Sequence, residues 1–175
     1  MEDVFIEIEA CAERDCVFLS FNRLAERALH VLLDLDGTLV DTDKEAFNDI
    51  KFGRDRGFAL SAIPSIRGAE AFVNALRDRG HSVTIVSDSH DAYVGPVAEN
   101  RFRVPWLALS DKPNTAKLRA YLKEVFGFPG KVAAEEFLFV GDTKLDVQLA
   151  RGLSIPSAML SLGLDVHSQS PSEKF

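Results

Sequence analysis

Cysteine is scarce in this 175-residue chain, which contains only Cys11 and Cys16. Two cysteines are too few for a disulfide framework, and their spacing is not that of a zinc site. We interpret them as reduced thiols, with a disulfide between them as the alternative. Long apolar runs are also missing, because no stretch approaches the roughly 18 residues that a membrane span needs. The N-terminus begins with acidic residues and lacks the basic and apolar regions of a signal peptide. These absences predict a soluble, cytoplasmic protein without a membrane partner.

Positive charge is the second deficit. Lysine and arginine together number 20 against 27 acidic residues, which gives a formal charge of -7 and an isoelectric point near 5.1. This balance argues against an extended electrostatic interface with nucleic acid. It leaves open an enzyme that acts only on a phosphorylated nucleic-acid end. A hydrophobic fraction of 46% in 175 residues is typical of one folded domain with one core.

Short apolar runs alternate with amphipathic stretches from residue 30 onward. The runs are rich in branched and aromatic residues, as strands buried on both faces are; they cover 30–35, 82–87, 105–109, 137–140 and 157–160. Helical spacing appears between them over 71–79, 116–125 and 144–151, with Gly80, Gly127 and Gly152 as stop signals. The alternation predicts an α/β fold, a Rossmann-like three-layer sandwich with a central parallel sheet.

The domain organisation follows from the same pattern. Residues 30–166 form the predicted domain, and 41–67 form a small flap with one helix over about 44–56. Residues 1–29 are expected to be an appendage packed on the core, with a strand over 4–9 and a helix face near 21–29. The polar tail 167–175 is expected to be flexible.

Two carboxylates, Asp34 and Asp36, follow the first strand and precede Gly37. They could be incidental acids of a polar turn, but an unpaired charge at the end of an apolar strand is costly. The functional interpretation makes Asp34 a nucleophile and Asp36 an acid/base group. Gly37 then lets the chain turn sharply and bring backbone amides close to a phosphate.

Polar residues also follow the second and third strands. A serine such as Ser87 is usually a turn or cap residue, but its hydroxyl can also donate to a phosphate oxygen. Asp88 can cap the following helix or face the substrate, and both alternatives stay open. A lone loop lysine is usually solvated, yet Lys112 follows a strand and precedes a proline that is expected to start a helix. Its ammonium can balance a phosphate and the carboxylates.

The fourth strand is followed by Asp142 and, in the first turn of the next helix, Asp146. The helix dipole alone can explain an acid at the second position. It does not explain a second acidic cluster at the end of another apolar strand. Together with Asp34 and Asp36 these residues form an oxygen-rich site of the kind that Mg²⁺ prefers, and the absence of histidine and cysteine there argues against zinc.

These four motifs, in this order, resemble those of the haloacid dehalogenase superfamily over about residues 30–162. The matching residues are Asp34-Leu35-Asp36-Gly37-Thr38-Leu39-Val40, Ser87, Lys112 and Gly141-Asp142-Thr143-Lys144-Leu145-Asp146. The resemblance implies a Mg²⁺-dependent phosphatase that forms an aspartyl phosphate on Asp34. It implies metal binding by Asp34, by the backbone carbonyl of Asp36 and by Asp142, with Asp146 close by or acting through water. The resemblance also implies that Ser87 and Lys112 bind the phosphate. Asp88, which we include among the phosphate-binding residues, stands where asparagine is common in the family.

Many relatives in this family have a whole helical domain where this chain has only the short flap, so the resemblance implies a minimal cap and an open site. In this family an open site often accompanies oligomers or macromolecular substrates, and a homo-oligomer is one expectation. The expected substrate is a small phosphorylated metabolite. The alternatives are a phosphatase acting on a nucleic-acid end or a phosphoprotein, and a catalytically quiet binding or regulatory module. The flap helix is either a solvated helix packed by Phe47 and Ile50, or a flap whose Lys51 or Arg54 steers an anionic substrate inward.

Overall fold

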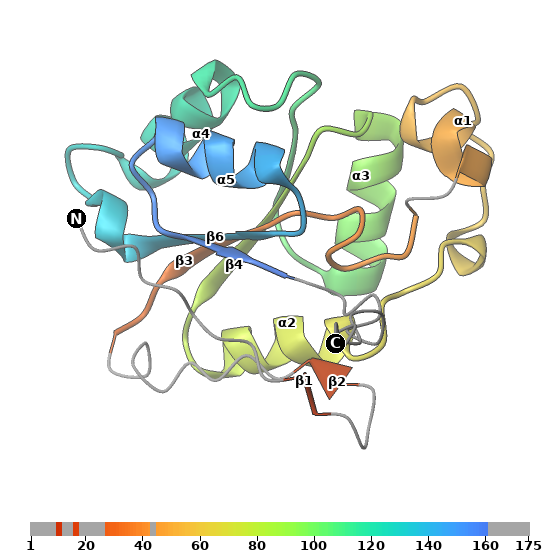
Figure 1. Ribbon diagram of the computed structural model, residues 1–175, viewed down its shortest axis with the longest axis horizontal. Helices are drawn as coiled ribbons and strands as arrows, with labels where there is room; N and C mark the ends of the chain where they lie inside the picture. The colour runs from red at the N-terminus through yellow and green to blue at the C-terminus, as the bar shows by residue number, and fades with distance from the viewer. Residues whose placement is uncertain (1–9, 12–15, 18–26, 43–44, 161–175) are drawn as a thin grey trace, which may run out of the picture.

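Figure 1 shows the computed structural model of the chain, which describes residues 10–11, 16–17, 27–42 and 45–160. The predicted strand 4–9, most of the appendage 1–29 and the tail 167–175 lie outside the described residues. Ala28 and Leu29, which were predicted to lie on a helix face, are not helical. Among the described residues, no helix has the length and apolar character that a membrane span requires.

A five-stranded parallel sheet forms the centre of the domain (Figure 1). Its strands are β3 (His30–Leu33), β4 (Ser82–Ser87), β5 (Trp106–Ala108), β6 (Phe137–Gly141) and β7 (Ser157–Met159). They lie in the order β5-β4-β3-β6-β7, and every neighbouring pair is parallel. All five predicted strands are therefore present, and β3, which carries the first motif, lies in the middle. A separate antiparallel pair joins β1 (Ala10–Cys11) to β2 (Cys16–Val17).

Helices cover both faces of the sheet. α2 (Ala69–Asp78) and α3 (Asp91–Val97), which continues into the π-helix η3 (Ala98–Phe102), lie on one face; α4 (Ala116–Phe126) and α5 (Lys144–Gly152) lie on the other (Figure 1). Alternate strand residues point to opposite faces, so Val31 and Leu33 join the core under α2 and α3, while Leu32 joins the core under α4 and α5. The predicted three-layer α/β sandwich is confirmed.

The flap contains less helix than the sequence pattern predicts. The 3₁₀ turn η1 (Glu45–Phe47) leads into α1 (Asn48–Lys51), and η2 (Leu60–Ala62) follows before α2. The predicted helix over 44–56 is wrong beyond residue 51, because Gly53 adopts a φ of 70° that ends the helix. A short 3₁₀ turn, η4 (Ala134–Glu136), precedes β6. The chain thus leaves β3, forms a small lobe beside the carboxyl end of the sheet and returns to the body.

Two further local expectations are corrected. Pro113 does not start a helix, since α4 begins at Ala116 after Thr115, and the Lys112–Pro113 peptide bond is cis. Asp88 does not cap α3, because His90 occupies that position and its ring nitrogen Nδ1 accepts from the amide of Ala92 at 3.1 Å. A helix cap must have its side-chain acceptor within reach of the second or third helical amide, and Asp88 lies two residues too early for that.

Candidate active site

The centre of the site is a buried cluster of one lysine and two aspartates: Asp34 from the loop after β3, Lys112 from the loop after β5, and Asp146 from the first turn of α5. Asp34 follows β3 and keeps the sheet register, because its amide donates to the carbonyl of Val140 at 2.8 Å. The ammonium of Lys112 contacts Asp34 directly and lies 2.8 Å from Oδ1 of Asp146. The three side chains are 3%, 5% and 2% exposed for Lys112, Asp34 and Asp146, respectively. Charges this deeply buried are tolerated only when they are paired.

Burial and charge shift the ionisation of this cluster in defined directions. Burial raises the pKa of Asp34 well above its ordinary value, although the Lys112 ammonium opposes the shift and the Asp146 carboxylate adds to it. Burial by itself lowers the pKa of Lys112, but the two carboxylates overcome this effect and raise that pKa above its ordinary value. Lys112 therefore carries its full charge at neutral pH and provides the counter-charge at the end of β3.

Asp146 is held by the start of its own helix. Its Oδ2 accepts from the hydroxyl of Thr143 at 2.6 Å and from the amide of Thr143 at 3.0 Å, which makes a capping box at the N-terminus of α5. A Cβ atom at Gly141 would lie 2.5 Å from Cγ of Asp146, so only glycine fits there. Both oxygens of Asp146 therefore have protein partners, Lys112 on one side and Thr143 on the other.

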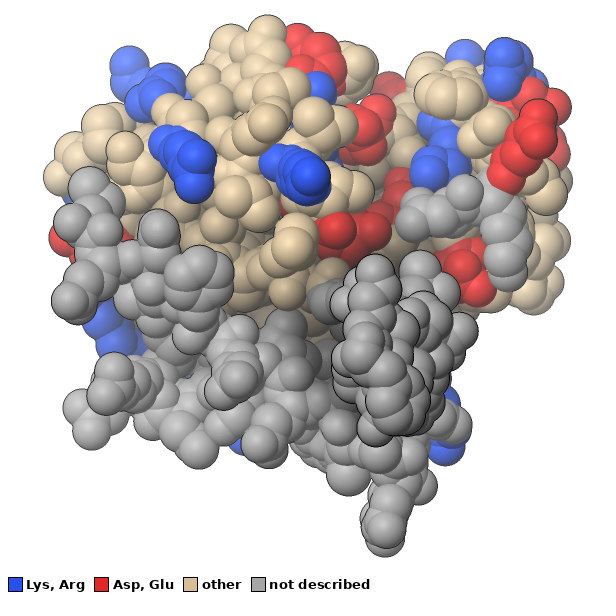
Figure 2. Space-filling view, in the orientation of Figure 1, with Lys and Arg blue, Asp and Glu red and all other residues tan. Residues whose placement is uncertain are grey.

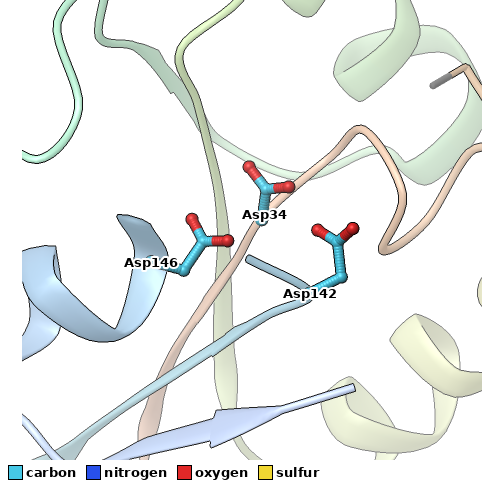
Figure 3. Close-up of side chains that lie close together, drawn as sticks. All are labelled: Asp34, Asp142 and Asp146. Carbon is cyan, nitrogen blue, oxygen red and sulfur yellow. The ribbon is translucent and has the colours of Figure 1, made fainter. Parts of the chain in front are cut away.

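Asp142 completes a group of three carboxylates, with Asp34 and Asp146, that point toward one another (Figure 3). One carboxylate oxygen of each lies within 4.8 Å of the others. The hydroxyl of Thr38 donates to Oδ1 of Asp142 at 3.2 Å, which ties the loop after β3 to the loop after β6. Three clustered carboxylates are the hard oxygen ligands that Mg²⁺ takes. The three carboxylates thus fit a Mg²⁺ ion, and each also has a protein partner: Lys112 for Asp34 and Asp146, and Thr38 for Asp142.

Asp36 lies beside this cluster, and its carboxylate accepts from four hydroxyl groups. Oδ1 accepts from Thr42 and, at 2.9 Å, from Tyr93; Oδ2 accepts from Ser89 at 2.7 Å and from Ser87 at 3.3 Å. The side chain of Asp36 is therefore not part of the carboxylate cluster. Its proposed metal contact concerns the backbone carbonyl and stays a prediction.

Sequence reasoning did not find three of these four hydroxyl partners: Thr42, Ser89 and Tyr93. The sequence did contain a signal for Ser89. Residues two apart along a strand point to the same face, so Ser89 could have been expected to point the same way as Ser87. Tyr93 is fully buried in α3, and burial raises the pKa of its phenol, with the Asp36 carboxylate adding to the shift. A buried phenol needs a hydrogen-bond partner, and here the partner is Asp36.

The two predicted phosphate-binding residues after β4, Ser87 and Asp88, differ from each other in burial and in their contacts. The hydroxyl of Ser87 is buried, donates to Asp36 and accepts from the amide of Ser89 at 3.1 Å. Asp88 is exposed, and it is not part of the carboxylate cluster. Phosphate binding by these two residues stays a prediction.

The flap contributes Lys51 to the site and turns Arg54 away. The ammonium of Lys51 lies 3.7 Å from Oδ1 of Asp36, and its side chain is 19% exposed. Arg54 pairs with Asp49 at 2.8 Å on the outside of the lobe, where both side chains are more than half exposed. Of the two flap cations that we considered from the sequence as steering residues, Lys51 lies beside Asp36 and Arg54 does not.

Acidic side chains gather in the furrow between the α1 lobe and the body of the domain (Figure 2). A cavity of about 480 Å³ lies elsewhere, beside η2, α2 and η3, and none of the predicted site residues lines it. The cavity is therefore separate from the predicted site.

No protein-family model matches the sequence, and no curated protein is significantly similar to it. Solved structures do match the fold. A candidate haloacid dehalogenase-like hydrolase from Bacteroides fragilis is 13% identical, with a TM-score of 0.61, over 81% of this chain and 91% of that one. A haloacid dehalogenase family enzyme from Bacteroides thetaiotaomicron, in complex with magnesium and inorganic phosphate, is 17% identical, with a TM-score of 0.50. The match covers 81% of this chain and 98% of that one. A phosphoserine phosphatase holding an analogue of the phospho-aspartyl intermediate is 15% identical, with a TM-score of 0.50. The match covers 77% of this chain and 94% of that one. The chain therefore has the haloacid dehalogenase-like Rossmann fold.

Proposed function

We propose that the protein is a Mg²⁺-dependent phosphomonoester hydrolase that works through an aspartyl phosphate on Asp34. The observation that carries the proposal is the buried contact between Asp34 and Lys112, next to a carboxylate cluster and within two residues of Asp36. A structural role alone would not require a third carboxylate, Asp142, beside the two that already pair with the buried ammonium. The similarity to a phosphatase holding a phospho-aspartyl analogue and to an enzyme with bound magnesium and phosphate supports the same chemistry.

In the first half-reaction a carboxylate oxygen of Asp34 attacks phosphorus and the ester P–O bond breaks. Asp36 gives a proton to the departing oxygen, so the product leaves as an alcohol. In the second half-reaction Asp36 takes a proton from water, the water oxygen attacks phosphorus, and the bond to Asp34 breaks to release phosphate. Lys112 stabilises the negative charge on the transferring phosphoryl group. A bound Mg²⁺ ion, held by Asp34 and Asp142 with Asp146 nearby, would add charge neutralisation there.

A small phosphorylated metabolite is the proposed substrate class. A macromolecular phosphate is the second candidate, and the open furrow favours it, because a short flap leaves room for a large leaving group (Figure 2). A quiet binding module is disfavoured, since it would have no use for Asp34, Asp36, Lys112 and Asp142 as a complete set.

The test is Mg²⁺-dependent hydrolysis of 4-nitrophenyl phosphate by the wild-type protein and by Asp34→Asn. The amide is nearly isosteric with the carboxylate but is a poor nucleophile, so we expect turnover to vanish while the protein stays folded. Acid-quenched wild-type protein should carry phosphate on the peptide containing Asp34. Asp78→Asn, an exposed change at the end of α2, is the matched control and should keep full activity. Near-normal turnover in folded Asp34→Asn protein would refute the proposal.

A further inference from the structure

Lys51 is the flap cation that lies over the acid/base residue. Its ammonium is 3.7 Å from Oδ1 of Asp36 and its side chain is mostly buried, at 19% exposure. Arg54 pairs with Asp49 on the outside of the lobe, and Arg56 is exposed and donates to the carbonyl of Gly53 at 3.3 Å. The lobe therefore directs a single one of these three positive charges inward.

Asp36 does not need Lys51 to satisfy its carboxylate. The two oxygens offer about four lone-pair sites, and the hydroxyls of Thr42, Ser87, Ser89 and Tyr93 already donate to them. A separation of 3.7 Å is also too long for a hydrogen bond. The ammonium is thus a counter-charge of the Asp36 carboxylate rather than its hydrogen-bond partner.

The backbone holds this lysine in place. The carbonyl of Lys51 accepts from the amide of His90 at 2.7 Å, which ties the end of α1 to the start of α3. Gly53 packs directly under the His90 ring, where an added Cβ would lie 2.5 Å from a ring carbon. Phe58 also contacts the edge of Tyr93, with ring centroids 5.8 Å apart. These contacts fix α1 against the body, so the position of Lys51 follows from packing.

We propose that Lys51 forms a subsite for a second anionic group, a carboxylate or a phosphate, on the leaving group of the substrate. This inference rests on the proposed function. Asp36 must come within about 3 Å of the ester oxygen to protonate it, and Lys51 is next to Asp36, so Lys51 lies on the leaving-group side. Lys112, on the Asp34 side, serves the transferring phosphoryl group. Because the ammonium is 3.7 Å from Oδ1 of Asp36, an anion with a charge-assisted bond of about 2.8 Å to Lys51 belongs to a part of the leaving group near the ester oxygen, and short substrates test this best.

Matched substrates separate this subsite from a general effect on catalysis. Carboxymethyl phosphate carries the second anion, and carbamoylmethyl phosphate is its neutral analogue of nearly the same shape. Ethane-1,2-diyl bisphosphate tests a phosphate as the second anion. We expect Lys51→Met to lower kcat/KM at least tenfold for one or both anionic substrates, mainly through KM, and less than threefold for the neutral one. Lys51→Arg should restore much of the loss, and Arg54→Met is the control that should change none of the ratios. Thermal unfolding of each variant verifies that it is folded.

The outcomes distinguish the subsite from the proposed function. A wild-type protein that hydrolyses none of these esters or 4-nitrophenyl phosphate with Mg²⁺ refutes the proposed function and, with it, the subsite. Hydrolysis with equal losses for neutral and anionic substrates in Lys51→Met refutes the subsite alone, because the lysine then acts through Asp36. Unchanged kcat/KM for all substrates also refutes the subsite. A selective loss with only the carboxylate or only the bisphosphate identifies which anion the subsite takes.

Discussion

Replacing Lys112 by methionine tests the electrostatic centre of the site. Methionine keeps most of the length and volume of the side chain but removes the ammonium, so Asp34 and Asp146 lose their shared counter-ion. The lysine side chain is 3% exposed, and water cannot replace the missing charge without a rearrangement. Asp146 retains its bonds from Thr143, whereas Asp34 loses the contact that neutralises it.

The expected cost follows from this burial. Breaking a buried ion pair by removing one partner costs about 3–5 kcal/mol. Protonation of Asp34 limits the loss, because burial already raises the pKa of that carboxyl and removal of Lys112 raises it further. We therefore expect a loss of about 3 kcal/mol at pH 8 in chelator, a large share of the roughly 5–15 kcal/mol of a typical domain.

The pH dependence has a definite sign. A raised folded-state pKa means that the folded protein binds the carboxyl proton more tightly than the unfolded chain, whose pKa is about 3.9. The resulting stabilisation is complete below the unfolded pKa and is lost as pH rises through the folded-state pKa. Lys112→Met should therefore be least harmful near pH 4–5 and most harmful at pH 8. In wild-type protein the raised pKa of Lys112 means that its stabilisation persists through neutral pH and is lost only in strong alkali.

The assay is urea unfolding of wild type and Lys112→Met at pH 5 and pH 8, in chelator. Lys144→Met, an exposed lysine at the start of α5, is the control and should shift neither midpoint. Phosphatase turnover of the variant should fall by roughly 10²–10³, the usual effect of losing one charge-stabilising donor. Equal urea midpoints for wild type and Lys112→Met at pH 8 would show that the lysine does not neutralise the buried carboxylates.

Three further predictions follow from the same geometry. Gly141→Ala should displace Asp146 and reduce turnover by at least tenfold while the protein stays folded, whereas Gly130→Ala, whose new Cβ would be 3.6 Å from its nearest neighbour, should be neutral; normal kinetics in Gly141→Ala would contradict the close approach. Mg²⁺ should raise the urea midpoint more at pH 8 than at pH 5, because burial raises the pKa of Asp34 and protons then compete with the cation; an equal rise at both pH values would place the ion away from Asp34. Tyr93→Phe keeps the buried ring but removes the donor 2.9 Å from Asp36, which is worth about 1.5–3 kcal/mol for a charged acceptor. It should slow hydrolysis of alkyl phosphates more than that of aryl phosphates, whose leaving groups need less protonation, and identical losses for both classes would exclude a role in positioning the acid.

The strands and the four polar strand ends are readable from the sequence because they depend on local pattern. Five continuous apolar runs can be buried only inside a sheet covered on both faces, and parallel strands bring their carboxyl ends to one edge. Asp34 and Asp142 were expected at that edge, but the fact that their strands, β3 and β6, are neighbours comes from the structure. The end of helical spacing at Gly80 and Gly127 is equally local, since both adopt positive φ.

The partners of those carboxylates are long-range contacts that local pattern does not encode. Lys112 is 78 residues from Asp34, and its cis peptide bond with Pro113 is not evident from the sequence. Ser89 and Tyr93 reach Asp36 only because α3 packs against the loop after β3, at separations of 53 and 57 residues.

Lys51 and Arg54 show the same difference between what local pattern predicts and what long-range contacts decide. They have the same charge and lie three apart on the expected helix face, so their spacing does not distinguish them. Gly53 ends the helix between them, and Lys51 is then held toward Asp36 by the bond from His90 while Arg54 turns outward to Asp49. Periodicity reports which face of an element is buried, but the direction of a side chain beyond the end of a helix depends on what the rest of the chain packs against it.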